Sequence, residues 1–249
     1  MKVKAILLAG GHGSRLYPFT KYTQKTLLPL HERPVIDYAL GTIRRAGIKD
    51  ITIVSNQFIG QITKHVGAGF PDERIHYVLE EEPTGVADAL NLARAYNENC
   101  RLLVYFSDNI TTVELAEEVA HFETSVEPPG CVLLAREESN PEAFGVAVLD
   151  DNNQVIDIVE KPETPPSNLA IGGIYMFDEL FWSSVDAGVT KNGTNFSISD
   201  VTRSYVARSA AKLLTLGEET WIDCGTHDSL LQAALMARDG KLNSRPHKD

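Results

Sequence analysis

The chain has 249 residues, of which 43% are hydrophobic and 23% charged, and its formal net charge is −11. A chain of this length can bury a substantial core, whereas the acidic balance argues against nucleic-acid binders and polybasic membrane-surface proteins, because both need cationic surfaces. Its three widely spaced cysteines offer neither a disulfide framework nor a metal knuckle, and no leader or apolar run of about 18 residues is evident, so we expect a soluble cytoplasmic protein.

A short apolar strand followed by a glycine-rich turn begins the chain. Residues 5–9 read Ala-Ile-Leu-Leu-Ala, as in a strand buried on both faces, and residues 10–15 read Gly-Gly-His-Gly-Ser-Arg. Glycines let backbone N–H groups approach an anion closely, and the guanidinium of Arg15 can grip phosphate oxygens, with Lys25 ten positions later. The turn matches neither the P-loop nor the G-x-G-x-x-G pattern. By themselves these residues indicate a glycine turn beside two cations.

Strand-like and helix-like segments alternate through the first half of the chain. Apolar runs predict strands at 51–54, 75–79, 101–106 and 131–135. Helical periodicity predicts helices between residues 34 and 47, near 57–66 and from 86 to 93. This alternation predicts an α/β fold with a Rossmann-like, mixed but mostly parallel sheet and helices on both faces.

Two polar segments follow strands in this half. Taken alone, residues 80–85, Glu-Glu-Glu-Pro-Thr-Gly, indicate a solvated turn. Asp108 and Asn109 follow the strand at 101–106, where ligands of open α/β sheets gather. An alternative is that Asp108 caps a helix beginning near Thr112.

The pattern changes after residue 136. Segments 145–149 and 155–159 predict a β-hairpin, which adds an antiparallel lid to the core. Glu160 and Lys161 end this hairpin and are by themselves most typical of an exposed strand end. The next strand, at 170–175, contains two glycines, which suggests that something packs close to its backbone.

The last quarter predicts a loop, two helices and a strand before a polar tail. The loop covers 192–195, the first helix 199–208 and the strand 212–216. In the final helix we expect Leu231, Ala234 and Leu235 to belong to the core. Residues 241–249 form the polar tail.

Five motifs spread from Gly10 to Thr226 resemble those of the sugar-1-phosphate nucleotidyltransferases, most closely the short glucose-1-phosphate thymidylyltransferases. They are G-G-x-G-S-R-L-x-P-x-T followed by a lysine and L-L-P, E-E-P-x-G at 81–85, D-N at 108–109, E-K-P at 160–162 and W-x-D-x-G-T at 221–226. The resemblance implies a single domain over residues 1–240, with a nucleotide-binding part at about 1–135 and a sugar-binding part at about 136–225. It also implies Mg²⁺-assisted attack of a sugar 1-phosphate on a nucleoside triphosphate, which releases pyrophosphate.

The resemblance further assigns roles to individual residues. Arg15 and Lys25 clamp the triphosphate as catalytic cations, and Asp108 and Asp223 are the metal ligands. The nucleotide contacts are Leu8, Ala9, Gly10, Gly11, Gly13, Ser14, Arg15, Glu80, Pro83 and Gly85. The sugar-phosphate contacts are Asn109, Gly145, Glu160, Lys161, Gly172 and Tyr175. Relatives of this kind are commonly oligomers, so we expect a homo-oligomer.

Two positions depart from the family pattern. Ser107 replaces a glycine, and Glu80 stands where the thymidylyl enzymes have glutamine. Glutamine can both donate to and accept from thymine or uracil, whereas ionised glutamate only accepts, which suits guanine or cytosine. We predict transfer from dTTP or UTP to a sugar 1-phosphate, most simply glucose 1-phosphate, with GTP or CTP as the alternative.

Two interpretations from other classes stay open. A non-catalytic sensor of nucleotides or sugar phosphates would be expected to have lost a metal carboxylate or a phosphate-binding cation, and all of these residue types are present here. An NAD-dependent oxidoreductase would need the third glycine of the dinucleotide pattern and an acid after the second strand to bind the ribose.

Overall fold

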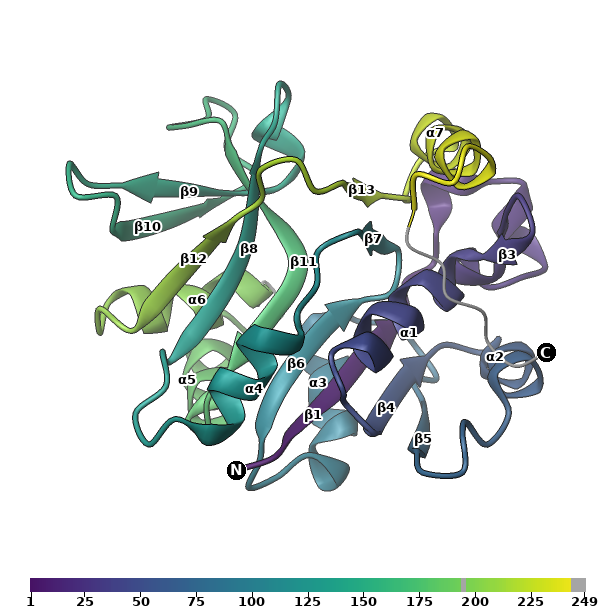
Figure 1. Cartoon of the computed structure of the whole chain (residues 1–249), viewed down its shortest axis with the longest axis horizontal. Helices are drawn as coiled ribbons and strands as arrows, with labels where there is room; N and C mark the ends of the chain where they lie inside the picture. Colours follow the sequence, from purple (N-terminus) through teal and green to yellow (C-terminus); the bar gives the residue numbers. More distant parts are fainter. Residues whose placement is uncertain (194–195, 243–249) are drawn as a thin grey trace.

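The computed structural model describes residues 1–193 and 196–242. Its centre is a sheet of nine strands (Figure 1). The central strands, in spatial order, are β5 (Arg74–Leu79), β4 (Asp50–Ser55), β1 (Val3–Ala9), β6 (Arg101–Phe106) and β11 (Leu169–Phe177). The first four are parallel, and β11 runs antiparallel to β6. The apolar runs of the sequence therefore form the centre of the sheet.

The remaining strands extend the sheet beyond β11. β8 (Cys131–Glu137) pairs antiparallel with β11, and β12 (Ala211–Thr215) pairs in parallel with β8. The predicted hairpin is present as β9 (Gly145–Leu149) and β10 (Val155–Glu160), and β9 also pairs with β11. Two short strands, β7 (Asn109–Thr111) and β13 (Trp221–Asp223), pair antiparallel in a separate small sheet. The predicted fold class is confirmed.

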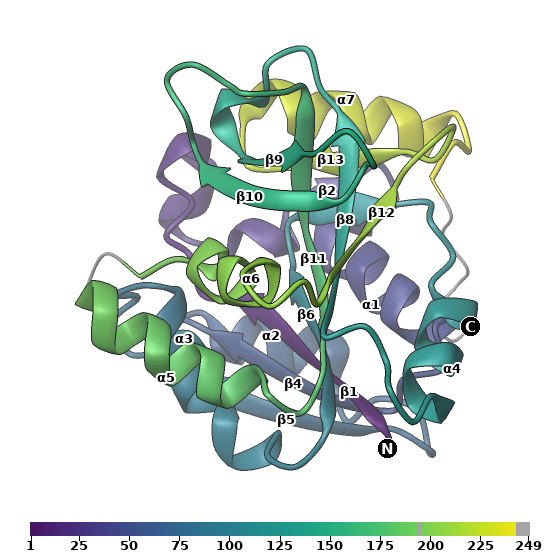
Figure 2. The ribbon, with the colours of Figure 1, turned by 90° about the vertical axis from the view of Figure 1, so that its left-hand side faces the viewer.

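Helices cover both faces of the sheet (Figure 2). α1 (Val35–Arg45), α2 (Ile59–Val66) and α4 (Ala116–Thr124) pack on one face, and α3 (Val86–Ala93), α5 (Phe181–Asn192) and α6 (Ile198–Val206) pack on the other. Successive side chains of β1 point to opposite faces, so Leu7 joins the first cluster and Ile6 the second. α7 (His227–Arg238) packs on the β2 (Pro29–Leu30) and β3 (Arg33–Pro34) hairpin in a third cluster.

Two expectations about the helices are wrong. The helix expected near Thr112 begins at Ala116, because Asn109–Thr111 first pair with β13, so Asp108 does not cap a helix. In α7 Leu231 and Leu235 are 60% and 43% exposed, while Leu230 and Ala233 are buried; of the three residues expected in the core, only Ala234 packs partly buried against the third cluster. Adjacent apolar residues on this helix allow two different apolar stripes. The packing against β2 buries the stripe that contains Leu230 and Ala233 instead of the predicted one.

The end of the described chain also differs from the expectation. Leu242 belongs to the predicted polar tail, but its side chain is buried in the third cluster. Residues 243–249 of that tail, and Thr194 and Asn195 of the predicted loop, lie outside the described residues. Within residues 1–193 and 196–242, no helix combines the length and the apolar composition that crossing a membrane requires.

A buried ion pair ties α1 to the loop before β5. Arg44 donates hydrogen bonds of 2.6 and 2.8 Å to Glu73, whose side chain is 0% exposed. Burial opposes ionisation of Glu73, but hydrogen bonds from Arg44 and from the Phe70 backbone N–H outweigh it and lower the pKa of this carboxyl group.

We expect Glu73→Gln to lower the free energy of unfolding by about 3 kcal/mol, because a neutral amide replaces the carboxylate that is paired with the buried Arg44 guanidinium. The lowered pKa means that the pair stabilises the fold above the unfolded-state pKa of glutamate, and that this contribution is lost as pH falls through the folded-state pKa. Urea unfolding at neutral and acid pH should therefore show a difference from wild type that shrinks in acid. As a control, Asp72→Asn in the exposed pair with Lys49 should leave the unfolding midpoint nearly unchanged.

Candidate active site

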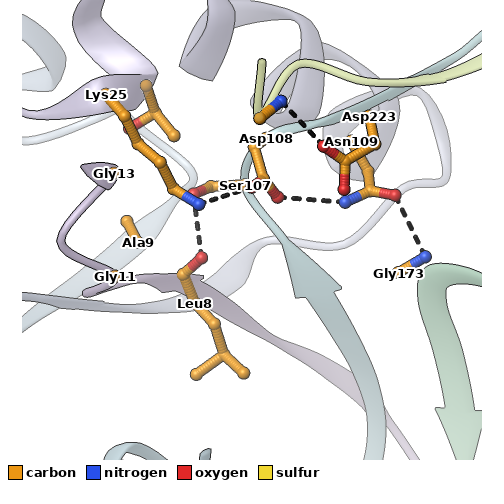
Figure 3. A network of polar contacts seen from close by, with 12 residues as sticks. Leu8, Ala9, Gly11, Gly13, Lys25, Ser107, Asp108, Asn109, Gly173 and Asp223 are labelled. Atoms are coloured by element: carbon orange, nitrogen blue, oxygen red, sulfur yellow. Dashed lines mark hydrogen bonds and ion pairs between the residues drawn. The ribbon is translucent and has the colours of Figure 1, made fainter. Parts of the chain in front are cut away.

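The glycine turn leaves β1 at the edge of the sheet where the parallel strands end. Gly13 has a left-handed backbone with φ of 63°, and a Cβ there would lie 2.9 Å from Thr20. The Thr20 hydroxyl donates to the Gly13 carbonyl at 2.8 Å and so fixes the turn. A Cβ at Gly11 would lie 3.5 Å from Lys25 Nζ, so the turn and this ammonium group are neighbours (Figure 3).

Two carboxylates from distant parts of the sequence meet beside Lys25. Asp108 follows β6, and Asp223 ends β13, where it pairs in register with Asn109. The Cys224 N–H donates to the Asp108 carbonyl at 2.8 Å and holds the two segments together. Lys25 Nζ forms an ion pair with Asp108 Oδ2, and Figure 3 shows the Asp223 side chain next to this pair.

The pKa values of the two carboxyl groups differ because Lys25 contacts only Asp108 directly, although its charge also acts on Asp223. Burial, followed by the charge of Asp108, raises the pKa of Asp223 to about 6. Burial acts in the same direction on Asp108, but the charge and hydrogen bond of Lys25 outweigh it and lower the pKa of that group. The carboxylate pair therefore carries more negative charge than Lys25 balances.

Arg15 and Gly225 complete the surroundings of Asp223. The Gly225 N–H donates to Asp223 Oδ1 at 2.7 Å. A Cβ at Gly225 would lie 2.5 Å from Arg15 Nη2 and 2.6 Å from Asp223 Oδ1, so the missing side chain lets the guanidinium approach the carboxylate. Any larger residue at this position of the W-x-D-x-G-T motif would clash with Arg15 and Asp223, which explains the glycine.

The donor set of the carboxylate pair fits Mg²⁺. This ion favours oxygen ligands and is commonly held by one or two carboxylates together with water and substrate phosphates. Asp108 and Asp223 supply two such carboxylates, and in the described part of the chain no third Asp, Glu, His or Cys joins them. The remaining ligands would have to come from solvent and from a phosphate substrate.

Asn109 connects the carboxylate pair to two other strands. Its amide nitrogen donates to Asp108 at 3.0 Å, and its oxygen accepts from the Gly173 N–H at 3.0 Å and the Trp221 indole at 2.7 Å. The residue is 3% exposed. Asn109 borders the hairpin side of the site, and these bonds to Asp108, β11 and β13 use its amide oxygen and one of its two amide N–H groups.

Two cavities meet at Asp108. The first, called here the glycine-turn cavity, has a volume of about 260 Å³ and lies between β1, the loop at 80–85 and α3. The second, called the hairpin cavity, has a volume of about 690 Å³ and lies between β11, the β9–β10 hairpin and β13. Phe106 and Asp108 line both. One elongated ligand could therefore occupy the two cavities with its middle beside the carboxylates.

Most of the residues assigned from the motifs line these cavities. In the glycine-turn cavity they are Leu8, Gly10, Gly11, Lys25, Glu80, Pro83 and Gly85. In the hairpin cavity they are Arg15, Asn109, Gly145, Glu160, Lys161, Tyr175 and Asp223.

Four of the assigned residues line neither cavity: Ala9, Gly13, Ser14 and Gly172. The backbone carbonyl of Ala9 accepts hydrogen bonds from buried side chains. Gly172 faces the Trp221 indole, 3.1 Å from the position of a Cβ, and its neighbour Gly173 lines the hairpin cavity instead. Gly173, and not the predicted Gly172, therefore lines this cavity, because alternate residues of a strand point to opposite faces.

Further residues that the sequence reasoning missed also line the cavities. His12 and Phe106 border the glycine-turn cavity, and Trp221 and Thr226 border the hairpin cavity. The last two lie inside the W-x-D-x-G-T motif, which was a signal that could have found them.

A serine on α6 orients the carboxyl group of Glu160. The Ser199 hydroxyl donates to Glu160 Oε2 at 2.5 Å, and a Cβ at Gly145 would lie 3.3 Å from that hydroxyl. Lys161 lies at the rim of the hairpin cavity with its side chain 67% exposed, 3.8 Å from Glu160 Oε1. The hairpin cavity therefore presents a carboxylate held by Ser199 and, at its rim, an exposed ammonium group that is loosely paired with the same carboxylate.

A glycine turn, three cations and a carboxylate pair at the edge of an open α/β sheet form a site for phosphate groups. Residues 4–240 match the model of the nucleotidyl transferase family. The chain belongs to this family.

Curated relatives and solved structures place the chain within the family. It is 34% identical to the glucose-1-phosphate thymidylyltransferase of Xanthomonas campestris, over 93% of this chain and 79% of the relative. It is 31% identical to the enzyme of that name from Neisseria meningitidis, over 93% of this chain and 81% of the relative. A putative glucose-1-phosphate thymidylyltransferase from Bacillus anthracis, solved with sucrose, superposes with a TM-score of 0.89 at 33% identity, over 98% of both chains. The family resemblance drawn from the motifs is confirmed.

A more distant structure shows the same fold. A UDP-glucose pyrophosphorylase solved with UDP-glucose superposes with a TM-score of 0.80 at 22% identity, over 96% of this chain and the whole of that one.

Proposed function

We propose that the protein transfers a nucleotidyl group from dTTP or UTP to a sugar 1-phosphate, most simply glucose 1-phosphate, and releases pyrophosphate. The observation that carries this proposal is the meeting of Lys25, Asp108 and Asp223 between two cavities. The names of the thymidylyltransferase relatives support the choice of base and sugar. UTP is included because uracil offers the same hydrogen-bonding edge as thymine.

The two cavities suit the two ends of the product. The nucleoside would occupy the glycine-turn cavity and the sugar phosphate the hairpin cavity, so that the reacting phosphorus lies beside Asp108. Backbone N–H groups of the glycine turn, Arg15 and Lys25 would hold the triphosphate. Lys161 would hold the phosphate of the incoming sugar, and Glu160, oriented by Ser199, would accept hydrogen bonds from sugar hydroxyls.

The reaction needs positioning and charge neutralisation more than a base. An oxygen of the sugar 1-phosphate forms a bond to the α-phosphorus while the bond from that phosphorus to the β-phosphate oxygen breaks, and the electron pair leaves with pyrophosphate. The attacking phosphate is largely ionised at neutral pH, since its second pKa is about 6. The chain therefore has to align the two phosphates and stabilise the charge that develops between them.

Asp108 and Asp223 would hold the Mg²⁺ ion. Bound there, the ion would supply positive charge that offsets the negative charge developing on the phosphates. Asp108 is in direct contact with Lys25, so the same carboxylate that would hold the ion also orients this ammonium group.

The alternatives have different degrees of support. A sensor remains a weaker hypothesis, because Arg15, Lys161 and both carboxylates line one cavity. Dinucleotide binding also has less support, since the glycine turn continues into a three-residue 3₁₀ helix (Ser14–Leu16) and not into a long helix. Transfer from GTP or CTP is the second candidate, and an ionised Glu80 in the glycine-turn cavity would favour it.

Pyrophosphate release from a panel of nucleoside triphosphates and sugar 1-phosphates tests the proposal. We expect release with dTTP or UTP and glucose 1-phosphate in the presence of Mg²⁺. Removal of the metal with EDTA should lower the rate by more than about 10²-fold, because the two carboxylates then repel the phosphates. Binding of both substrates without release of pyrophosphate from any pair would contradict the proposal and identify a sensor.

A further inference from the structure

The side chain of Glu80 lies at the floor of the glycine-turn cavity. The residue follows β5, its N–H donates to the Ser55 carbonyl at 2.8 Å, and it is 3% exposed. A Cβ at Gly10 would lie 1.9 Å from Glu80 Oε2. The missing side chain at Gly10 therefore leaves the space that this carboxyl group occupies, and the two residues fit only as a pair.

The surroundings of Glu80 offer nothing to stabilise a negative charge. The cavity wall around it is largely apolar and includes Leu8, Pro83, Val86, Ala89 and Phe106. Among the described residues, burial and the charge of Asp88 are the influences on the Glu80 carboxyl group, and both raise its pKa, with no contribution from a donor or a cation.

The charged groups near Glu80 do not supply a counter-charge to its carboxyl group. Lys25 lines the same cavity but is paired with Asp108. His12 stands at the cavity mouth on the glycine turn, and the exposed Glu81 lines a neighbouring hollow with it. On α3, the exposed carboxylate of Asp88 accepts a hydrogen bond from Thr84, and its negative charge acts on Glu80.

Burial without a counter-charge favours the neutral form of a carboxyl group. Burial, followed by the charge of Asp88, raises the pKa of Glu80 above its usual range. A neutral carboxylic acid has one O–H donor and one carbonyl acceptor side by side, as the amide of glutamine has a donor and an acceptor. Thymine and uracil present the complementary pair, a ring N–H flanked by carbonyl oxygens.

We infer that Glu80 binds the nucleobase as a neutral carboxylic acid, donating its O–H to a pyrimidine carbonyl and accepting the ring N–H on its other oxygen. This inference rests on the proposed function for the position of the base. The protonation state of one side chain then sets the class of substrate. Neutral Glu80 selects dTTP and UTP, whereas ionised Glu80 would accept the two adjacent N–H groups of guanine and select GTP.

The test compares wild type with Glu80→Gln, which has the same shape and cannot ionise. We expect kcat/KM of the wild type for dTTP or UTP to fall relative to the variant as pH rises through the pKa of Glu80, by about tenfold, because the donor is lost. Dividing kcat/KM of the wild type by that of the variant at each pH cancels the effect of phosphate ionisation, which is the same for both enzymes. Asp88→Asn, made in the protein that keeps Glu80, removes a charge that raises the pKa of Glu80. The fall in kcat/KM should therefore occur at lower pH in this variant than in wild type. Glu81→Gln, an exposed neighbour in the same loop, should leave the profile unchanged.

Two outcomes would overturn the inference. A ratio that stays constant with pH means that Glu80 does not titrate against the base, and a wild-type preference for GTP that Glu80→Gln removes means that the ionised form reads guanine. If no triphosphate yields pyrophosphate, calorimetric binding of dTDP and UDP to the same variants gives the same comparison. Failure of the proposed reaction and failure of the role of Glu80 are thus separated.

Discussion

We expect the replacement of Lys25 by methionine to lower the turnover of the proposed reaction by about 10³-fold while the protein stays folded. The Lys25 ammonium group is the cation paired with Asp108, and it lies beside the glycine turn. In the complex it would neutralise charge on the transferring phosphate, so its loss should lower kcat much more than it raises KM for the triphosphate. Pyrophosphate release at saturating substrates measures the effect.

The control for this prediction is Lys21→Met. Lys21 lies on the same segment of chain, is exposed and contacts the ring of Tyr22 instead of the carboxylates. Its loss should change turnover by less than about twofold, since a solvent-exposed charge away from the phosphates is screened. Unchanged pyrophosphate release in the Lys25 variant would remove this residue from the catalytic site.

The fold could be predicted from the sequence because its strands are continuous apolar runs. The run from Ala5 to Ala9 is buried on both faces, as such runs are in parallel sheets. The failures occurred where local patterns were ambiguous. Asn109–Thr111 is too short to show a strand period, and in α7 the pairs Leu230–Leu231 and Ala233–Ala234 permit two apolar stripes.

The site could be located from motifs, but its contacts could not. The motif around Asp223 indicated a metal ligand, whereas its register opposite Asn109 depends on the pairing of two three-residue strands. The difference between Gly172 and Gly173 depends on which face of β11 each residue occupies. The burial of Glu80 beside Gly10 is also a tertiary property, since these residues meet only when β1 and β5 flank β4.

Asp223→Asn should also lower turnover by about 10³-fold, but it should raise the stability of the metal-free protein. The substitution removes one of two carboxylates that would hold Mg²⁺, so the charge on the reacting phosphates is less well neutralised. Calorimetry with Mn²⁺ in place of Mg²⁺ should show weaker binding to the variant than to wild type. Asp228→Asn, an exposed acid at the start of α7, is the matched control and should bind metal as wild type does.

The stability of the metal-free protein should rise in the same variant. The pKa of Asp223 is about 6 in the folded protein, against 3.8 for an ordinary aspartate, so ionisation of this group is less favourable in the folded chain than in the unfolded one. Wild type therefore loses stability as pH rises from the lower value to the higher, by at most about 3 kcal/mol, and the loss persists at neutral pH. Thermal unfolding without metal should show the asparagine variant more stable than wild type at neutral pH and equal to it in acid. Mg²⁺ should then raise the melting temperature of wild type more than that of the variant, because the variant keeps only the Asp108 carboxylate of the pair; equal stabilisation of both proteins would show that the ion binds elsewhere.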